Sequence, residues 1–183
     1  MVASAFTHGL VAFALGKLAA GRRMPVRFWV LTILCAVVPD VDVVSFYFGI
    51  PYNSMFGHRG ITHSLAFAML LAVLVVLLAF REIETFSKKW WVLLIYFFVV
   101  TASHGLLDAL TNGGLGVAFF APFDSTRYFF PWRPIEVSPL SISAFFSRRG
   151  LEVFASEFVW VWIPTSIIVG AVLLYRRLRP LLK

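Results

Sequence analysis

The sequence predicts an all-α fold, a polytopic helical membrane protein with about five transmembrane helices in a single domain, residues 1–183. Hydrophobic residues make up 60% of the chain and charged residues only 14%. A typical soluble domain has about 45–50% apolar and about 25% charged residues. The mean hydropathy is +0.87. Five apolar segments follow one another along the chain, and each crossing of a bilayer needs about 20 residues, so the length suits about five crossings.

The apolar segments share a low content of charged residues, and they cover residues 2–20, 28–38 continued by 43–50, 64–80, 90–110 and 158–175. No Lys or Arg precedes the first segment, whereas cations follow it. This order is the reverse of that in a secretory signal, so we expect a retained helix. Pro39 ends or kinks the second helix because proline cannot donate a helical hydrogen bond. Residues 111–157 are predicted to form one long extracytoplasmic connection, with an interfacial helix near residues 141–146.

The distribution of cations predicts the orientation. The chain has 16 Lys and Arg against 9 Asp and Glu. With five crossings, eleven of the cations lie in the first and third connections and the C-terminal tail, and five lie on the other side. The positive-inside rule then places the N-terminus outside and the C-terminus in the cytoplasm. This rule also accounts for the net charge of +7 without a nucleic-acid partner.

The same topology brings histidines and aspartates from four segments to the outer side, and these residues are His8, Asp40, Asp42, His58, His63, His104 and Asp108. Ionisable side chains within or beside membrane helices are costly, so they are candidates for function. His104 and Asp108 are four residues apart and share one helix face. That pair can chelate a metal, or the carboxylate can fix the imidazole tautomer. An isolated hydrogen bond between them, and solvated aspartates at the end of the second helix, are the structural alternatives.

Mixed nitrogen and oxygen ligands suit zinc, with manganese or iron as further choices when carboxylates are more numerous. The six predicted metal ligands are His8, Asp40, Asp42, His63, His104 and Asp108, and this number exceeds the needs of one catalytic zinc. We therefore expect one or two ions. The sequence leaves open which of Asp40, Asp42 and His58 ligate metal. It contains neither the HExxH metalloprotease motif nor a GxSxG nucleophile elbow.

Arg59 lies between two histidines in the stretch His58–Ser64, directly before the third apolar segment. A helix N-terminus favours anions, and a guanidinium group suits a phosphate or carboxylate. We expect Arg59 to bind substrate there, with Arg127 as a second candidate. An interfacial cation that contacts lipid headgroups is the structural alternative for Arg59.

Four motifs together resemble the YdjM-like family, and they are Thr7-His8-Gly9, Pro39-Asp40-Val41-Asp42, His58-Arg59-Gly60-Ile61-Thr62-His63-Ser64 and Ser103-His104-Gly105-Leu106-Leu107-Asp108. The loops at residues 110–114 and 121–128 also look like that family. The resemblance implies an inner-membrane, metal-dependent hydrolase, in a family mostly of unknown function. The order His, Asp, His and then His-x-x-x-Asp is also similar to zinc-dependent phospholipase C, which favours phosphoester chemistry.

These observations predict a membrane-embedded metallohydrolase that cleaves a phosphoester of a lipid or lipid-linked substrate at the outer membrane face. A metal-bound water with its pKa lowered toward 7 would be the nucleophile. The predicted catalytic residues are His58, Arg59 and Asp42, and the predicted substrate-binding residues are Arg59 and Arg127. The alternative function is a non-enzymatic, metal-dependent membrane transporter or regulator.

Overall fold

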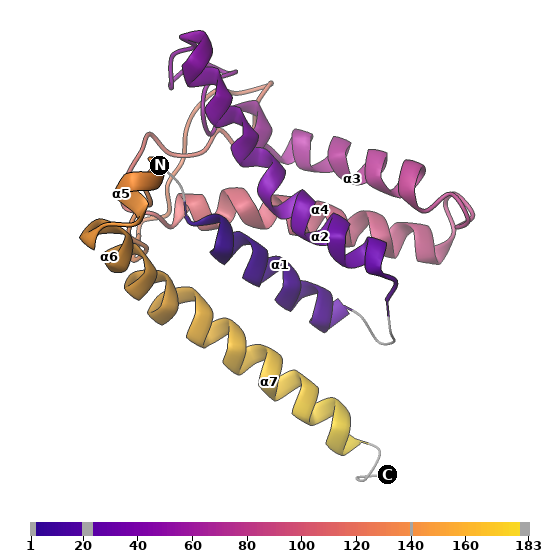
Figure 1. Cartoon of the computed structure of the whole chain (residues 1–183). Helices are drawn as coiled ribbons and strands as arrows, with labels where there is room; N and C mark the ends of the chain where they lie inside the picture. The colour runs from indigo at the N-terminus through magenta and orange to yellow at the C-terminus, as the bar shows by residue number, and fades with distance from the viewer. Residues whose placement is uncertain (1–2, 20–23, 140, 180–183) are drawn as a thin grey trace.

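The computed structural model describes residues 3–19, 24–139 and 141–179, and within these ranges the chain is helical without a strand. The elements are α1 (Ala5–Ala19), α2 (Val26–Val37), η1 (Val38–Phe48), η2 (Ile61–His63), α3 (Leu65–Ala79), α4 (Lys88–Ala109), α5 (Ile142–Phe145), α6 (Arg148–Glu157), η3 (Phe158–Trp162) and α7 (Ile163–Leu178) (Figure 1). The predicted all-α membrane fold is confirmed. Arg22, Arg23, Lys183 and the first two residues, which enter the orientation argument, lie outside the described residues.

Three continuous helical stretches are long and apolar enough to cross a membrane, and these are Val26–Phe48, Lys88–Ala109 and Arg148–Leu178. The first and third apolar segments form α1 and α3, which have 15 residues each. At 1.5 Å per residue each is about 22 Å long, shorter than a hydrocarbon core of about 30 Å. The structure therefore supports three full crossings by length, and the count of five stays a prediction.

The last helical stretch begins at Arg148, ten residues before the apolar segment that predicted it. Ser147 caps this start, since its hydroxyl accepts a hydrogen bond from the Arg149 amide at 3.2 Å. Glu152 then pairs with Arg149 on the exposed face of α6. Because α6 is amphipathic and charged, it does not continue the apolar segment, and the sequence pattern therefore placed it in the 111–157 connection. The predicted interfacial helix near residues 141–146 corresponds to the single turn of α5.

Helix α4 is the central helix of the bundle. It packs against α1, α2 and α3, and buried residues lie along most of its length. Its Phe97 is fully buried, with its ring centroid 5.9 Å from that of Phe28 in α2 and 5.7 Å from that of Phe80, directly after α3. By contrast, α7 buries none of its residues and packs mainly on α1. A helix that is apolar and exposed all round is suited to lipid.

The alternating direction of the helices brings five chain segments together at one end of the bundle. The start of α1, the start of η1, the η2 turn, the end of α4 and the end of α6 meet there, beside the irregular loop between α4 and α5 (Figure 1). Each predicted ligand lies on one of these segments or on the loop that leads into η2. The opposite end holds Lys17, Arg27, Lys88 and Arg176. The histidines therefore lie at one end and these four cations at the other, while Arg59 and Arg127 share the site end and Glu82 pairs with Arg27 at the opposite end.

Candidate metal centre

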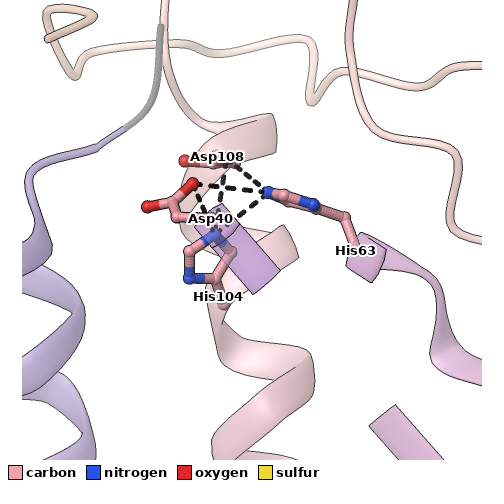
Figure 2. A group of neighbouring side chains, drawn as sticks. All are labelled: Asp40, His63, His104 and Asp108. Atoms are coloured by element: carbon pink, nitrogen blue, oxygen red, sulfur yellow. Dashed lines mark hydrogen bonds and ion pairs between the residues drawn. The ribbon is translucent and has the colours of Figure 1, made fainter. Parts of the chain in front are cut away.

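Four side chains from three segments converge at the site end of the bundle: Asp40 from η1, His63 from η2, and His104 and Asp108 from α4 (Figure 2). The Nε2 atoms of His63 and His104 lie 3.0 Å apart. Asp40 Oδ1 is 3.3 Å from His104 Nε2 and 3.7 Å from His63 Nε2. Asp108 Oδ2 is 3.3 Å from His63 Nε2 and 3.8 Å from His104 Nε2. One atom of each residue therefore faces a common centre.

These separations suit one tetrahedral ion. With bonds of about 2.0–2.1 Å, neighbouring ligand atoms around such an ion lie about 3.3–3.4 Å apart. The five distances above fall on both sides of that value. Asp40 Oδ1 and Asp108 Oδ2 are buried and have no hydrogen-bond partner within the described part of the chain. Two carboxylate oxygens and two histidine nitrogens at this spacing repel one another unless a cation or a proton lies between them, so this set fits a divalent metal.

The outer nitrogen of each histidine is held by a hydrogen bond, which fixes the tautomer. The Nδ1–H of His104 donates to the Ala36 carbonyl at 2.7 Å. His63 Nδ1 lies 3.1 Å from Asp42 Oδ2. In both cases Nε2 keeps the lone pair that faces the centre. Ligating histidines in metalloproteins usually have such a partner on the other ring nitrogen, so the surroundings match the ligand set.

Asp42 lies in this second layer rather than at the centre. Its Oδ1 is 2.6 Å from His58 Nδ1, while its Oδ2 accepts from the Arg59 amide at 3.0 Å and from the Thr62 hydroxyl at 2.5 Å. A separation of 2.6 Å is a hydrogen bond and is shorter than two ligands of one ion require. Asp42, His58 and His63 could form a second metal group. As placed, they form a hydrogen-bonded network that holds the η2 turn in position.

Arg59, which the sequence predicted to bind substrate, is fully buried. Its Nε lies 3.1 Å from Asp108 Oδ2, and its Nη2 and Nη1 donate to Thr111 Oγ1 at 2.9 Å and to the Gly113 carbonyl at 3.1 Å. Its φ of 60° is in the left-handed region. Gly114 makes room for the guanidinium, since a Cβ there would lie 3.0 Å from Nη1. Arg59 therefore neutralises and orients Asp108 from behind.

The Arg127 guanidinium also forms its hydrogen bonds within the protein. Its Nη1 donates to the His58 carbonyl at 2.9 Å, and its Nη2 donates to the carbonyls of Tyr52 and Ser54 at 2.8 and 3.0 Å. The guanidinium also lies over the Tyr52 ring, 5.4 Å from its centroid. Arg127 thus fastens the loop before η2 to the loop after α4. As placed, it supports the site from outside and does not face the ligand group.

His8 lies directly beside the four-residue group. Its ring stacks on His104, with centroids 3.7 Å apart, and its Nε2 is 3.6 Å from Asp108 Oδ1. That Asp108 oxygen accepts a hydrogen bond from the Ala3 amide at 2.9 Å. Neither ring nitrogen of His8 has a hydrogen-bond partner among the described residues. The structure therefore brings all six predicted ligands together, with four at the centre, His8 beside His104 and Asp42 beside His63.

Sequence reasoning missed Glu157. This carboxylate is fully buried at the end of α6 and accepts hydrogen bonds from the amide and the hydroxyl of Ser4 at 2.5 and 2.6 Å. It also accepts from the Thr7 hydroxyl at 2.8 Å, and Trp162 Nε1 donates to the same hydroxyl at 2.7 Å. Glu157 thus caps the start of α1. A single acidic residue directly before an apolar segment was the available signal.

The fold and this site define a helical membrane protein with a buried His/Asp group that could hold a metal ion. Residues 3–179 match the family described as YdjM inner membrane protein. The chain is 37% identical over 171 residues to inner membrane protein YbcI of Escherichia coli (strain K12), covering 93% of this chain and 97% of that protein. The chain therefore belongs to the YdjM family of inner membrane proteins. No solved structure matches it.

Proposed function

We propose that this chain is a metal-dependent hydrolase that acts within the membrane on a phosphoester of a lipid or lipid-linked substrate. The observation that carries the proposal is the convergence of Asp40, His63, His104 and Asp108 beside an apolar cavity. Two neighbouring carboxylates within a membrane protein are costly, and only Asp108 has a buried arginine beside it. A divalent ion would balance their charge, while Arg59 supplies a further positive charge behind Asp108.

A cavity of about 460 Å³ leads to the metal group, which supports a lipid substrate. It is lined mainly by apolar residues of α1, η1 and the segment around α5, including Phe6, Val43 and Phe145. Asp40 also lines it, and the Asp40 side chain is 19% exposed, whereas those of His63, His104 and Asp108 are 0% exposed. The volume lies in the usual range of ligand sites, about 300–1,000 Å³. A substrate chain in this cavity would bring its polar end to the Asp40 side of the group.

The residues of the site have different chemical roles in this proposal. A divalent ion, with zinc as the first choice, would be held by Asp40, His63, His104 and Asp108, and it would supply a Lewis acid and an activated water. Asp42 and His58, in contact at 2.6 Å, form the nearest pair that can hold or move a proton. Arg59 and Asp42 act as positioning residues, since their contacts are with Asp108 and His63. Arg127 has the same supporting role for the loop that carries His58.

The choice of a phosphoester rests on the order of the His and Asp motifs, which is similar to that of zinc-dependent phospholipase C. An amide or carboxylic ester of a lipid would use the same ion and the same cavity. The substrate screen described below separates these classes.

One observation favours the alternative of a non-enzymatic metal-dependent membrane protein, such as a transporter or regulator. Four protein ligands complete a tetrahedral shell, whereas catalytic zinc usually keeps one position for water. The exposure of Asp40 to the cavity distinguishes the two functions. If the ion is catalytic, Asp40→Ala should keep a three-ligand site that still binds metal. If the ion is structural, this variant should lose both metal and thermal stability.

The test is an elemental analysis of the purified full-length chain, followed by a screen of phospholipids and polyprenyl phosphates. We expect wild type to hold metal and to release product, and His104→Ala to lose both. Ser103→Ala is the matched control, because its hydroxyl bonds the Val100 carbonyl of the same helix at 2.7 Å and takes no part in the group. Turnover that is independent of metal would overturn the proposal. Activity confined to amide or carboxylic ester lipids would keep the metal centre but refute the phosphoester.

A further inference from the structure

A second, larger cavity lies at the opposite end of the bundle from the metal group. Its volume is about 620 Å³, and α2, α4 and the turn after α3 enclose it. Its floor is apolar and includes Phe28, Phe80 and Leu93. Its rim carries Arg27, Glu82, Lys88 and Lys89. It shares no lining residue with the cavity beside Asp40, so it is an independent feature of the fold.

The rim has more positive than negative charge. The Arg27 guanidinium forms an ion pair with Glu82 and also lies over the Phe80 ring, 5.0 Å from its centroid. This pairing uses the single carboxylate among the residues that line the cavity. Within the described part of the chain, neither Lys88 nor Lys89 has a carboxylate at ion-pair distance. Two adjacent ammonium groups therefore face the mouth of an apolar cavity without a counter-charge.

These lysines also occupy the first turn of α4, which contains no acidic residue. The macrodipole disfavours cations and favours anions at a helix N-terminus. Ser87 caps the turn by accepting a hydrogen bond from the Trp90 amide at 3.3 Å. Both the side-chain charges and the helix end therefore favour an anion at this rim.

The apolar wall continues from the lysines along one face of α4. Lys89, Val92, Leu93 and Tyr96 follow a spacing of three, four and seven residues, which is one stripe of a helix. Over those seven residues the stripe is about 10 Å long. A ligand that follows it has a negative group at the lysines and an apolar chain directed toward the middle of the bundle.

We propose that this cavity binds an anionic phospholipid, with its phosphate at Lys88 and Lys89 and an acyl chain along the stripe on α4. Basic pockets between membrane helices bind anionic lipid headgroups in this way. A free phosphate ion would use the lysines but would leave the apolar floor without a partner, whereas a neutral lipid would use only the floor. The site is independent of the hydrolase proposal and can be tested on a protein without measured activity.

The experiment is a titration of the purified full-length chain by native mass spectrometry. The ligands are phosphatidylglycerol and phosphatidylcholine with identical acyl chains. We expect wild type to prefer phosphatidylglycerol, and the double variant Lys88→Gln/Lys89→Gln to bind it about tenfold or more weakly with unchanged binding of phosphatidylcholine. The control is Arg81→Gln/Arg177→Gln, which removes two exposed cations outside the cavity and should retain the preference.

Two further measurements identify the ligand class. Val92→Trp places a large ring in the stripe and should reduce binding of phosphatidylglycerol, while a water-soluble glycerophosphate should not stabilise wild type. Equal affinity of wild type for the two lipids, or an unchanged preference in the Lys88→Gln/Lys89→Gln variant, would overturn the proposal. An increase in the melting temperature with inorganic phosphate as large as that with phosphatidylglycerol would assign the rim to a soluble anion and refute the lipid site.

Discussion

At the scale of single residues, the site is built as a centre and a surrounding layer. His63 and His104 direct Nε2 inward because Asp42 and the Ala36 carbonyl hold their Nδ1 atoms. Arg59 holds Asp108 in the same manner through its Nε. His63, His104 and Asp108 are thus each held by a protein partner, which is the arrangement expected around a preorganised ion site.

The first prediction concerns Arg59. Because Thr111 Oγ1, the Gly113 carbonyl and Asp108 all depend on its guanidinium, Arg59→Lys leaves two acceptors without their donor. Hydrogen bonds to charged groups contribute about 1.5–3 kcal/mol each, so we expect a clear fall in the melting temperature together with at least tenfold lower turnover. Differential scanning fluorimetry of the purified protein checks this. The control is Arg133→Lys, at an exposed arginine that stacks on Phe129, and it should change neither the melting temperature nor the turnover. An Arg59→Lys protein as stable as wild type would contradict the buried role of the guanidinium.

The second prediction concerns pH. Burial alone would lower the pKa of His63, but its hydrogen bonds to Asp108, Asp40 and Asp42 outweigh burial and hold the pKa well above its ordinary value. Without metal, the proton on His63 therefore stabilises the fold at low pH, and this stability is lost as the pH rises through the raised pKa. We expect the melting temperature of metal-free protein to fall above neutral pH, and that of metal-loaded protein to change less. Similar curves for the two forms over that interval would exclude His63 from the ligand set.

The sequence predicted which residues gather at the site better than it predicted the role of each one. Each motif was visible in the sequence because ionisable residues are rare in apolar segments. Periodicity could not separate Asp40 from Asp42, since the two residues lie in one 3-10 stretch after Pro39 and differ only in the tertiary contacts they reach. The internal contacts of Arg59 could not be predicted, because its acceptors, Thr111 and Gly113, lie more than fifty residues later and are ordinary loop residues by themselves.

At the scale of secondary structure, caps and ion pairs lie mainly at the ends of helices. The apolar segments predicted α1, α3 and α4 to within a few residues, because long apolar runs have few alternatives in a membrane. The start of the last helical stretch was wrong by ten residues, since α6 is amphipathic and held by Ser147 and by its own ion pairs. Hydropathy alone therefore does not predict where a charged, capped helix begins.

The third prediction concerns the contact between α6 and α1. Glu157→Ala leaves the Ser4 amide and the hydroxyls of Ser4 and Thr7 without their acceptor, and each unsatisfied buried group costs about 1–3 kcal/mol. We expect a lower melting temperature and weaker metal binding, because the adjacent Ala3 amide holds Asp108. Competition with a chelator measures the affinity. Glu152→Ala, at an exposed position of the same helix, should match wild type in both; unchanged metal affinity in Glu157→Ala would mean that the start of α1 does not support the centre.

At the scale of the whole molecule, the bundle has two chemically different ends. His/Asp groups gather at one end, and Lys17, Arg27, Lys88 and Lys89 gather at the other. A membrane that attracts cations to its cytoplasmic side would therefore orient the whole bundle in one sense.

The fourth prediction is that orientation. With five crossings and the cation-rich end inside, the N-terminus is outside and the C-terminus is in the cytoplasm. A reporter fused after Lys183 should behave as cytoplasmic, and a cysteine introduced at the exposed Ser125 should react with a thiol reagent that does not cross the membrane. Labelling of Ser125→Cys only in opened cells would place the metal group on the cytoplasmic side instead. Cys35→Ser in the background removes the native thiol, which is buried.

All four residues of the central group lie between positions 40 and 108, and this has a consequence for biosynthesis. The ribosome has made every ligand before it begins α6 and the exposed helix α7, which packs on α1. The core of four helices and its ligands can therefore meet in the membrane while the remainder of the chain is still being translated. Glu157, which is synthesised later, then accepts hydrogen bonds from Ser4 and Thr7 at the start of α1.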